Sequence, residues 1–185
     1  MGLDKFFLDR NDTVLLIVDI QERLAAVMEK RGHVIANCTR LTELAKMLSI
    51  PVLVSEQYPK GLGRTVPELV SVIPSYSPVE KLTFDCCGEP SYMEVIKKTG
   101  RKKAIVTGME THICVLQTVL GLLKEGFDVH VVSDAVCSRT DANWKAGLDM
   151  MRDAGAVVTC TETVLFQALK VAGTEEFKAV SRMIK

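Results

Sequence analysis

Residues 14–19 read VLLIVD, five apolar side chains in a row followed by a carboxylate. A continuous apolar run of this length is typical of a strand that is buried on both faces of a parallel sheet. Further strand-like segments, bounded by turn-forming or polar residues, return along the chain. Five further strands are predicted at 51–55, 79–82, 104–107, 127–132 and 156–159.

Segments with helical spacing of apolar residues lie between these strands. They are predicted at 33–48, 91–98, 112–124, 143–154, 161–169 and 174–183, while 57–69 is expected to be mostly loop. Thr174 is expected to cap the last helix. The alternation of strand and helix predicts an α/β fold, in which a parallel sheet carries helices on both faces. Binding and catalytic residues of such folds follow the strands, at a topological switch point.

Length and composition narrow the class of protein. The 185 residues are 48% hydrophobic and 25% charged, which predicts one globular domain over residues 1–185. Because 23 Lys and Arg balance 23 Asp and Glu, we expect no nucleic-acid partner and no membrane partner, and a homo-oligomer is favoured. Met1–Arg10 has no signal-peptide pattern, so a cytoplasmic protein is expected.

One cysteine follows a predicted strand and begins a predicted helix. Cys114 comes shortly after the AIVT strand at 104–107. It can be interpreted as a buried thiol that acts as a small hydrophobe. Alternatively, the helix N-terminus favours its thiolate, and the free N–H groups there bind an oxyanion. Position alone leaves both interpretations open.

Two charged residues also lie at strand ends. Asp19 ends the first apolar run and is expected at the water-accessible end of its strand, although a carboxylate there can also cap a loop. If the first and fourth strands are neighbours, Asp19 can exchange a proton with the Cys114 thiol. Lys81 alone is typical of a solvated lysine, but beside Asp19 it would keep the acid ionised.

Three segments in this order resemble the isochorismatase-like cysteine hydrolases: LLIVDIQERL at 15–24, EKLTFD at 80–85 and VTGMETHICVLQT at 106–118. A fourth, EQYPKGLG at 56–63, resembles a loop of the isochorismatase domain-containing proteins in that family. The resemblance covers nearly the whole chain. It implies a three-layer α/β/α sandwich around a six-stranded, parallel, Rossmann-like sheet.

The resemblance also implies a catalytic triad of Asp19, Lys81 and Cys114. It implies a cis peptide bond between Met109 and Glu110. That bond would turn the Glu110 N–H toward the same point as the Cys114 N–H, and the two backbone groups would form the oxyanion hole.

Departures from the family pattern shape the expected chemistry. Metal-binding members carry histidines after the second strand, whereas residues 55–60 contain none, and His33, His112 and His130 lack ligand spacing. We therefore predict no metal and no cofactor. The members of the resembling family that cleave a vinyl ether lack the nucleophilic cysteine. Since a cysteine stands at position 114, the resemblance favours hydrolysis of a small amide through a thioester.

Four further residues are candidates for substrate binding. Leu24 stands where the family usually has an aromatic residue, which argues against stacking of a flat aromatic substrate. Gln57 and Tyr58 follow the second strand and are expected to line the pocket. His112 is expected at the pocket rim rather than in a Cys–His dyad, since residues two apart on a helix do not face each other.

Two other classes of function stay open at this point. The chain can be a non-catalytic oligomeric binding or scaffold protein with an inherited pocket. It can also be a thiol redox sensor that pairs Cys114 with another cysteine. The absence of a C-x-x-C motif argues against a sensor, and the adjacent Cys86 and Cys87 are expected to be free thiols.

Overall fold

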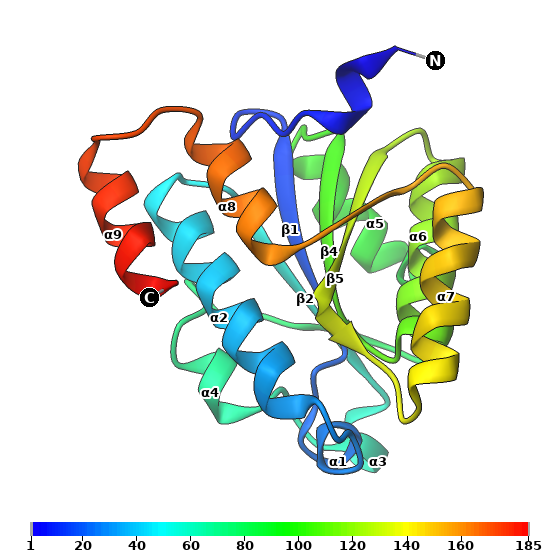
Figure 1. Cartoon of the computed structure of the whole chain (residues 1–185). Coiled ribbons are helices and arrows are strands. Elements are labelled where there is room, and N and C mark those ends of the chain that lie inside the picture. The colour runs from blue at the N-terminus through cyan, green and yellow to red at the C-terminus, as the bar shows by residue number, and fades with distance from the viewer. Residues whose placement is uncertain (1, 185) are drawn as a thin grey trace.

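The computed structural model describes residues 2–184 and contains a six-stranded, all-parallel sheet with helices on both faces (Figure 1). The strand order is β3-β2-β1-β4-β5-β6, so the switch point lies between β1 and β4. The predicted α/β/α sandwich is therefore confirmed. The strands are β1 (Thr13–Val18), β2 (Val52–Gln57), β3 (Val79–Lys81), β4 (Lys103–Met109), β5 (Asp128–Cys137) and β6 (Val157–Thr159).

The helices divide between the two faces of the sheet (Figure 1). One face carries α2 (Arg31–Met47), α4 (Pro67–Val70), α8 (Thr161–Leu169) and α9 (Glu175–Met183). The other carries α5 (Pro90–Lys98), α6 (Leu116–Lys124) and α7 (Asp141–Asp153). Short helices α1 (Glu22–Ala26) and α3 (Pro59–Leu62) lie at the carboxyl end of the sheet. Among residues 2–184, no helix has both the length and the apolar character needed to cross a bilayer.

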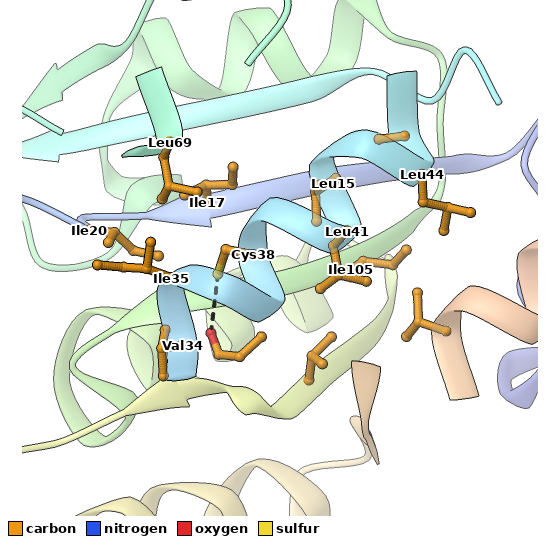
Figure 2. Packing of buried hydrophobic residues seen from close by; sticks show 14 of the residues in the cluster. Leu15, Ile17, Ile20, Val34, Ile35, Cys38, Leu41, Leu44, Leu69 and Ile105 are labelled. Carbon is orange, nitrogen blue, oxygen red and sulfur yellow. Dashed lines mark hydrogen bonds between the residues drawn. The ribbon is translucent and has the colours of Figure 1, made fainter. Parts of the chain in front are cut away.

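The first strand supplies both cores, because successive side chains of a strand point to opposite faces. Leu15 and Ile17 join the core under α2, and Leu16 and Val18 join the core under α5 to α7. Figure 2 shows the first of these cores, where the buried face of α2 packs on the sheet. The thiol of Cys38 lies in this core and donates a hydrogen bond to a backbone carbonyl of β5.

Strand β5 is five residues longer than predicted at its carboxyl end. Its register against β4 shifts between Val106 and Gly108, and the extra residues of β5 form a bulge there. Side chains from the flanking helices satisfy the carbonyls of the bulge: Trp144 donates to Ser133, and Asn37 donates to Asp134. The extension depends on these tertiary contacts, which the local apolar pattern does not reveal.

Segment 57–69 was expected to be mostly loop with room for a short helix at its end; α4 begins there, whereas α3 near the start of the segment was not expected. Each of these short helices begins at a proline, Pro59 or Pro67, which occupies the first helical position without a need for its missing N–H. The predicted cap of α9 is present, because the Thr174 hydroxyl accepts the N–H of Phe177.

Candidate active site

The three strand-end residues lie at the switch point of the sheet. Strands β1 and β4 are neighbours, as required for Asp19 and Cys114 to converge. The Lys81 Nζ lies 2.7 Å from Asp19 Oδ2, and both side chains are completely buried. Cys114 lies in a π-helical turn, Thr111–Val115, that joins β4 to α6, and it is 5% exposed.

Asp19 differs from its expected place at a water-accessible strand end, because its exposed fraction is zero. It follows β1 in a left-handed conformation with φ of 52°, which L residues rarely adopt. The backbone N–H of Asp19 donates to the Ser55 carbonyl, so the ladder with β2 continues past the last residue of β1. The carboxylate therefore sits under the surface, inside the sheet's carboxyl edge.

Lys81 is immobilised rather than solvated. Its ammonium donates to Asp19 Oδ2, to Gln57 Oε1 at 2.8 Å, and to the carbonyls of Thr83 and Phe84 at 3.1 and 3.3 Å. Burial is the largest single effect on Lys81 and would lower its pKa, but the charge and hydrogen bond of Asp19, together with the nearby thiols of Cys86 and Cys114, outweigh burial and raise the pKa. The ammonium therefore stays charged, holds the carboxylate and anchors the chain that follows β3.

Of the two interpretations that position left open for Cys114, the surroundings of the thiol favour the buried, protonated form. Burial raises the pKa of Cys114, and the charge and hydrogen bonding of Asp19 raise it further, whereas Lys81 opposes both effects. Desolvation and a nearby carboxylate thus outweigh the helix dipole. A base is needed to remove the thiol proton, and Asp19 is the carboxylate beside it.

A cavity of about 100 Å³ lies over Cys114. Two of the four predicted substrate residues, Leu24 and Gln57, line it. Tyr58 is 51% exposed and lines a separate hollow of about 330 Å³ that reaches Lys81. The ring of His112 lines neither, and its Nδ1 hydrogen-bonds with Ser138 Oγ at 3.0 Å. The remaining residues around the cavity are Leu62, Phe84, Glu110 and Ile113.

Two polar residues of the site were missed from the sequence. Ser55, at the end of the predicted second strand, donates its hydroxyl proton to Asp19 Oδ1 at 2.7 Å. Gln21 joins the loop over the site: its Nε2 donates to the carbonyls of Gln57 and Gly63, and its Oε1 accepts the N–H of Gln57. The only sequence signal for Ser55 was a polar residue at a strand end, the same signal that identified Asp19.

The peptide bond between Met109 and Glu110 is cis, as the resemblance implied. The carboxylate of Glu110 accepts two hydrogen bonds from Arg139, one from the backbone and one from Nε, each of 3.1 Å. The oxyanion hole formed by the N–H groups of Glu110 and Cys114 stays a prediction.

Residues 55–60 correspond to the segment that holds metal ligands in some members of the resembling family. Here this segment contains the structural carboxylate of Glu56. Burial alone would raise the pKa of Glu56, but hydrogen bonds from Tyr76, Thr65 and Arg64 outweigh it and lower the pKa. Across residues 2–184, no three His, Cys, Asp or Glu side chains are grouped to hold a metal ion.

Comparisons with known proteins agree with this architecture. The model of the isochorismatase domain matches residues 13–163. The chain is 37% identical to a secreted isochorismatase effector of Phytophthora sojae, over 95% of this chain and 85% of the relative. It is 35% identical to isochorismatase domain-containing protein 2 of Xenopus laevis, over 96% and 85% of the two chains.

Solved structures are similar over the same length. The MAR1 ribonuclease of Caenorhabditis elegans has a TM-score of 0.90 and 36% identity, and the match covers 96% of this chain and 92% of that one. YcaC of Pseudomonas aeruginosa, described with hexane-2,5-diol and covalent acrylamide, has a TM-score of 0.86 and 27% identity over 96% and 91% of the chains. The YcaC gene product of Escherichia coli, described as an octameric hydrolase of unknown specificity, has a TM-score of 0.89 and 26% identity over 96% and 90%.

The family match spans most of the chain, and relatives above 30% identity cover nearly all of it. The six-stranded parallel sheet agrees with the fold of the solved structures. The chain therefore belongs to the isochorismatase family and has the hydrolase fold of that family.

Proposed function

We propose that this chain is a metal-independent cysteine hydrolase, organised as one domain over residues 1–185, that cleaves a C–N bond of a small amide through a thioester on Cys114. The observation that carries the proposal is the buried ion pair between Lys81 and Asp19 beside a neutral thiol at the floor of a cavity. A buried ion pair costs desolvation free energy, and such arrangements concentrate at functional sites.

In the first half of the proposed reaction, the Asp19 carboxylate takes the thiol proton as Cys114 Sγ attacks the amide carbonyl carbon. The carbonyl electron pair moves to oxygen, where the N–H groups of Glu110 and Cys114 bind the oxyanion. When the oxyanion collapses, the C–N bond breaks and Asp19 gives its proton to the leaving nitrogen. A free amine departs, and the acyl group stays on sulfur.

In the second half, Asp19 takes a proton from water while the water oxygen attacks the thioester carbonyl. The C–S bond breaks, a carboxylic acid leaves, and the proton on Asp19 returns to sulfur. Lys81 stabilises the ionised carboxylate with which each half begins. Because four protein oxygens already share the three N–H groups of its ammonium, Lys81 acts by holding Asp19 rather than by contacting the substrate.

The size of the cavity favours a small substrate. About 100 Å³ holds only a few non-hydrogen atoms beside the sulfur. Leu24, Leu62 and Ile113 give the cavity apolar walls, and Gln57 and Glu110 add polar groups. YcaC of Pseudomonas aeruginosa carries covalent acrylamide, which makes acrylamide a suitable first covalent probe for this chain.

The test is intact-mass spectrometry of the folded protein after exposure to acrylamide and to a panel of small amides. We expect an adduct on Cys114 that is absent from Cys114→Ser and retained in Cys160→Ser, a control at a partly exposed thiol. If no probe modifies Cys114, the binding or scaffold alternative replaces the proposal. RNA is tested separately as a substrate, because the similar protein of Caenorhabditis elegans is described as a ribonuclease.

We also propose a homo-oligomer located in the cytoplasm. Leu82 and Phe84 are 74% and 53% exposed, and with Tyr58 they surround the openings over the site. A second copy packed on these side chains would narrow the cavity, and the Escherichia coli relative is octameric. Light scattering should report an oligomer that Leu82→Asp dissociates; a monomeric wild type would contradict the proposal.

A further inference from the structure

The base of the proposed reaction is held on both of its carboxylate oxygens. Lys81 binds Asp19 Oδ2, and Ser55 Oγ donates to Asp19 Oδ1 at 2.7 Å. All three side chains are buried. A carboxylate fixed at both oxygens cannot rotate, so its remaining lone pairs keep one direction relative to the thiol of Cys114.

A second thiol lies behind Ser55. Cys86 begins the turn Cys86–Gly88 after β3, is completely buried, and has its Sγ 3.5 Å from Ser55 Oγ. Its backbone N–H donates to Thr118 Oγ1 at 3.0 Å, which fixes the turn against α6. A hydroxyl has one proton, and Ser55 donates it to Asp19. The S–H of Cys86 is therefore the donor in its contact with Ser55.

We infer that Ser55, oriented by Cys86, is a positioning residue for Asp19. This inference rests on the proposed function, in which Asp19 accepts the proton of Cys114. Ser55 favours the ionised carboxylate by donating to it, and Cys86 keeps the hydroxyl aimed at Asp19 by occupying an acceptor site on its oxygen.

The chemical state of Cys86 suits this role. Burial raises the pKa of Cys86 to about 11, with a further rise from Asp19 and an opposing effect of Lys81. Its sulfur therefore carries a proton across the neutral range and remains a donor. Cys86 is thus a part of the site that the three-residue reaction scheme does not use.

The test measures alkylation of Cys114 by iodoacetamide across acid to alkaline pH, quantified by peptide mass spectrometry. In wild type, the rate should fall toward acid pH, because transfer of the thiol proton away from sulfur becomes less favourable there. In Ser55→Ala, the half-maximal pH of this fall should rise by about one unit, because a hydrogen bond to the charged form is lost. Cys86→Ala should shift it less, in the same direction.

Matched variants separate positioning from damage to the fold. Ser55→Thr keeps the hydroxyl and should restore the wild-type midpoint. Cys38→Ala removes another fully buried thiol, one that donates to the Ala135 carbonyl at 3.6 Å in the opposite core, and should leave the midpoint unchanged (Figure 2). Thermal melts of each variant confirm that the labelled protein is folded.

The measurement distinguishes failure of the positioning role of Ser55 from failure of the proposed cysteine hydrolase mechanism. An acid-side midpoint that is the same in Ser55→Ala and wild type overturns the positioning role and leaves the hydrolase proposal standing. A shift of equal size in Cys38→Ala also overturns it. If Cys114 of the wild type reacts no faster than Cys160, the activated thiol of the proposed function is contradicted, and the inference falls with it.

Discussion

Replacement of Lys81 by methionine isolates what the buried ion pair contributes. Methionine has nearly the same length but no charge, so Lys81→Met leaves the Asp19 carboxylate buried without its cation. Both side chains are fully buried and their atoms lie 2.7 Å apart, so solvent does not screen the loss. Removal of one partner of a buried pair costs about 3–5 kcal/mol, because an uncompensated charge stays in the interior.

For a chain of this length, that loss corresponds to a fall in Tm of about 10 °C. The assay is thermal and urea unfolding followed by circular dichroism at neutral pH. The double variant Lys81→Met with Asp19→Asn removes both charges, so it should recover part of the lost free energy of unfolding.

Lys103 provides the matched control. Its Nζ pairs with Asp128 Oδ2 at 2.8 Å, but that carboxylate is 43% exposed. Lys103→Met should therefore cost about 1 kcal/mol or less. If Lys81→Met costs no more than Lys103→Met, or if the double variant recovers none of the lost free energy of unfolding, the reasoning about an uncompensated buried charge is refuted.

Four other substitutions test separate parts of the structure by urea unfolding. Glu56→Gln should lower the free energy of unfolding at neutral pH. Since folding lowers the pKa of Glu56 from 4.5, the stabilisation by its carboxylate is present above about pH 4.5 and is lost as the pH falls further. The stabilities of wild type and variant should therefore converge in acid. Gly108→Ala should cost at least about 3 kcal/mol, because its φ is 134° and a Cβ would lie 2.1 Å from a backbone oxygen. Gly100→Ala, with φ of 67° and open space around it, should cost only about 1–2 kcal/mol. Thr174→Ala should cost about 1 kcal/mol through loss of the α9 cap, and no loss would contradict the capping role.

Local pattern predicted most of the fold because burial leaves a direct mark on the chain. The apolar run of β1 serves two cores at once, so both alternating sets of its side chains must be apolar. The cap at Thr174 is also local, since acceptor and donor lie three residues apart. The extension of β5 is different, because Asn37 and Trp144 stabilise it from distant helices.

The residues of the candidate site also divide into those that the local pattern indicates and those that only the tertiary structure reveals. Asp19, Lys81 and Cys114 could be predicted because each lies near the end of a strand or the start of a helix. Ser55 gave the same weak signal, but only the register of β2 against β1 places its hydroxyl on Asp19. Cys86 was expected only to be a free thiol, because its contact with Ser55 joins residues far apart in the chain.

The sequence by itself determined the alternation of strands and helices, the parallel sheet, and the three polar residues at its carboxyl edge. Only the tertiary structure decided their chemical states. Asp19 is buried rather than accessible, and Cys114 is a neutral thiol rather than a thiolate. The physical reason is that burial and hydrogen-bond partners depend on which segments fold over a residue, whereas secondary structure depends largely on its neighbours along the chain.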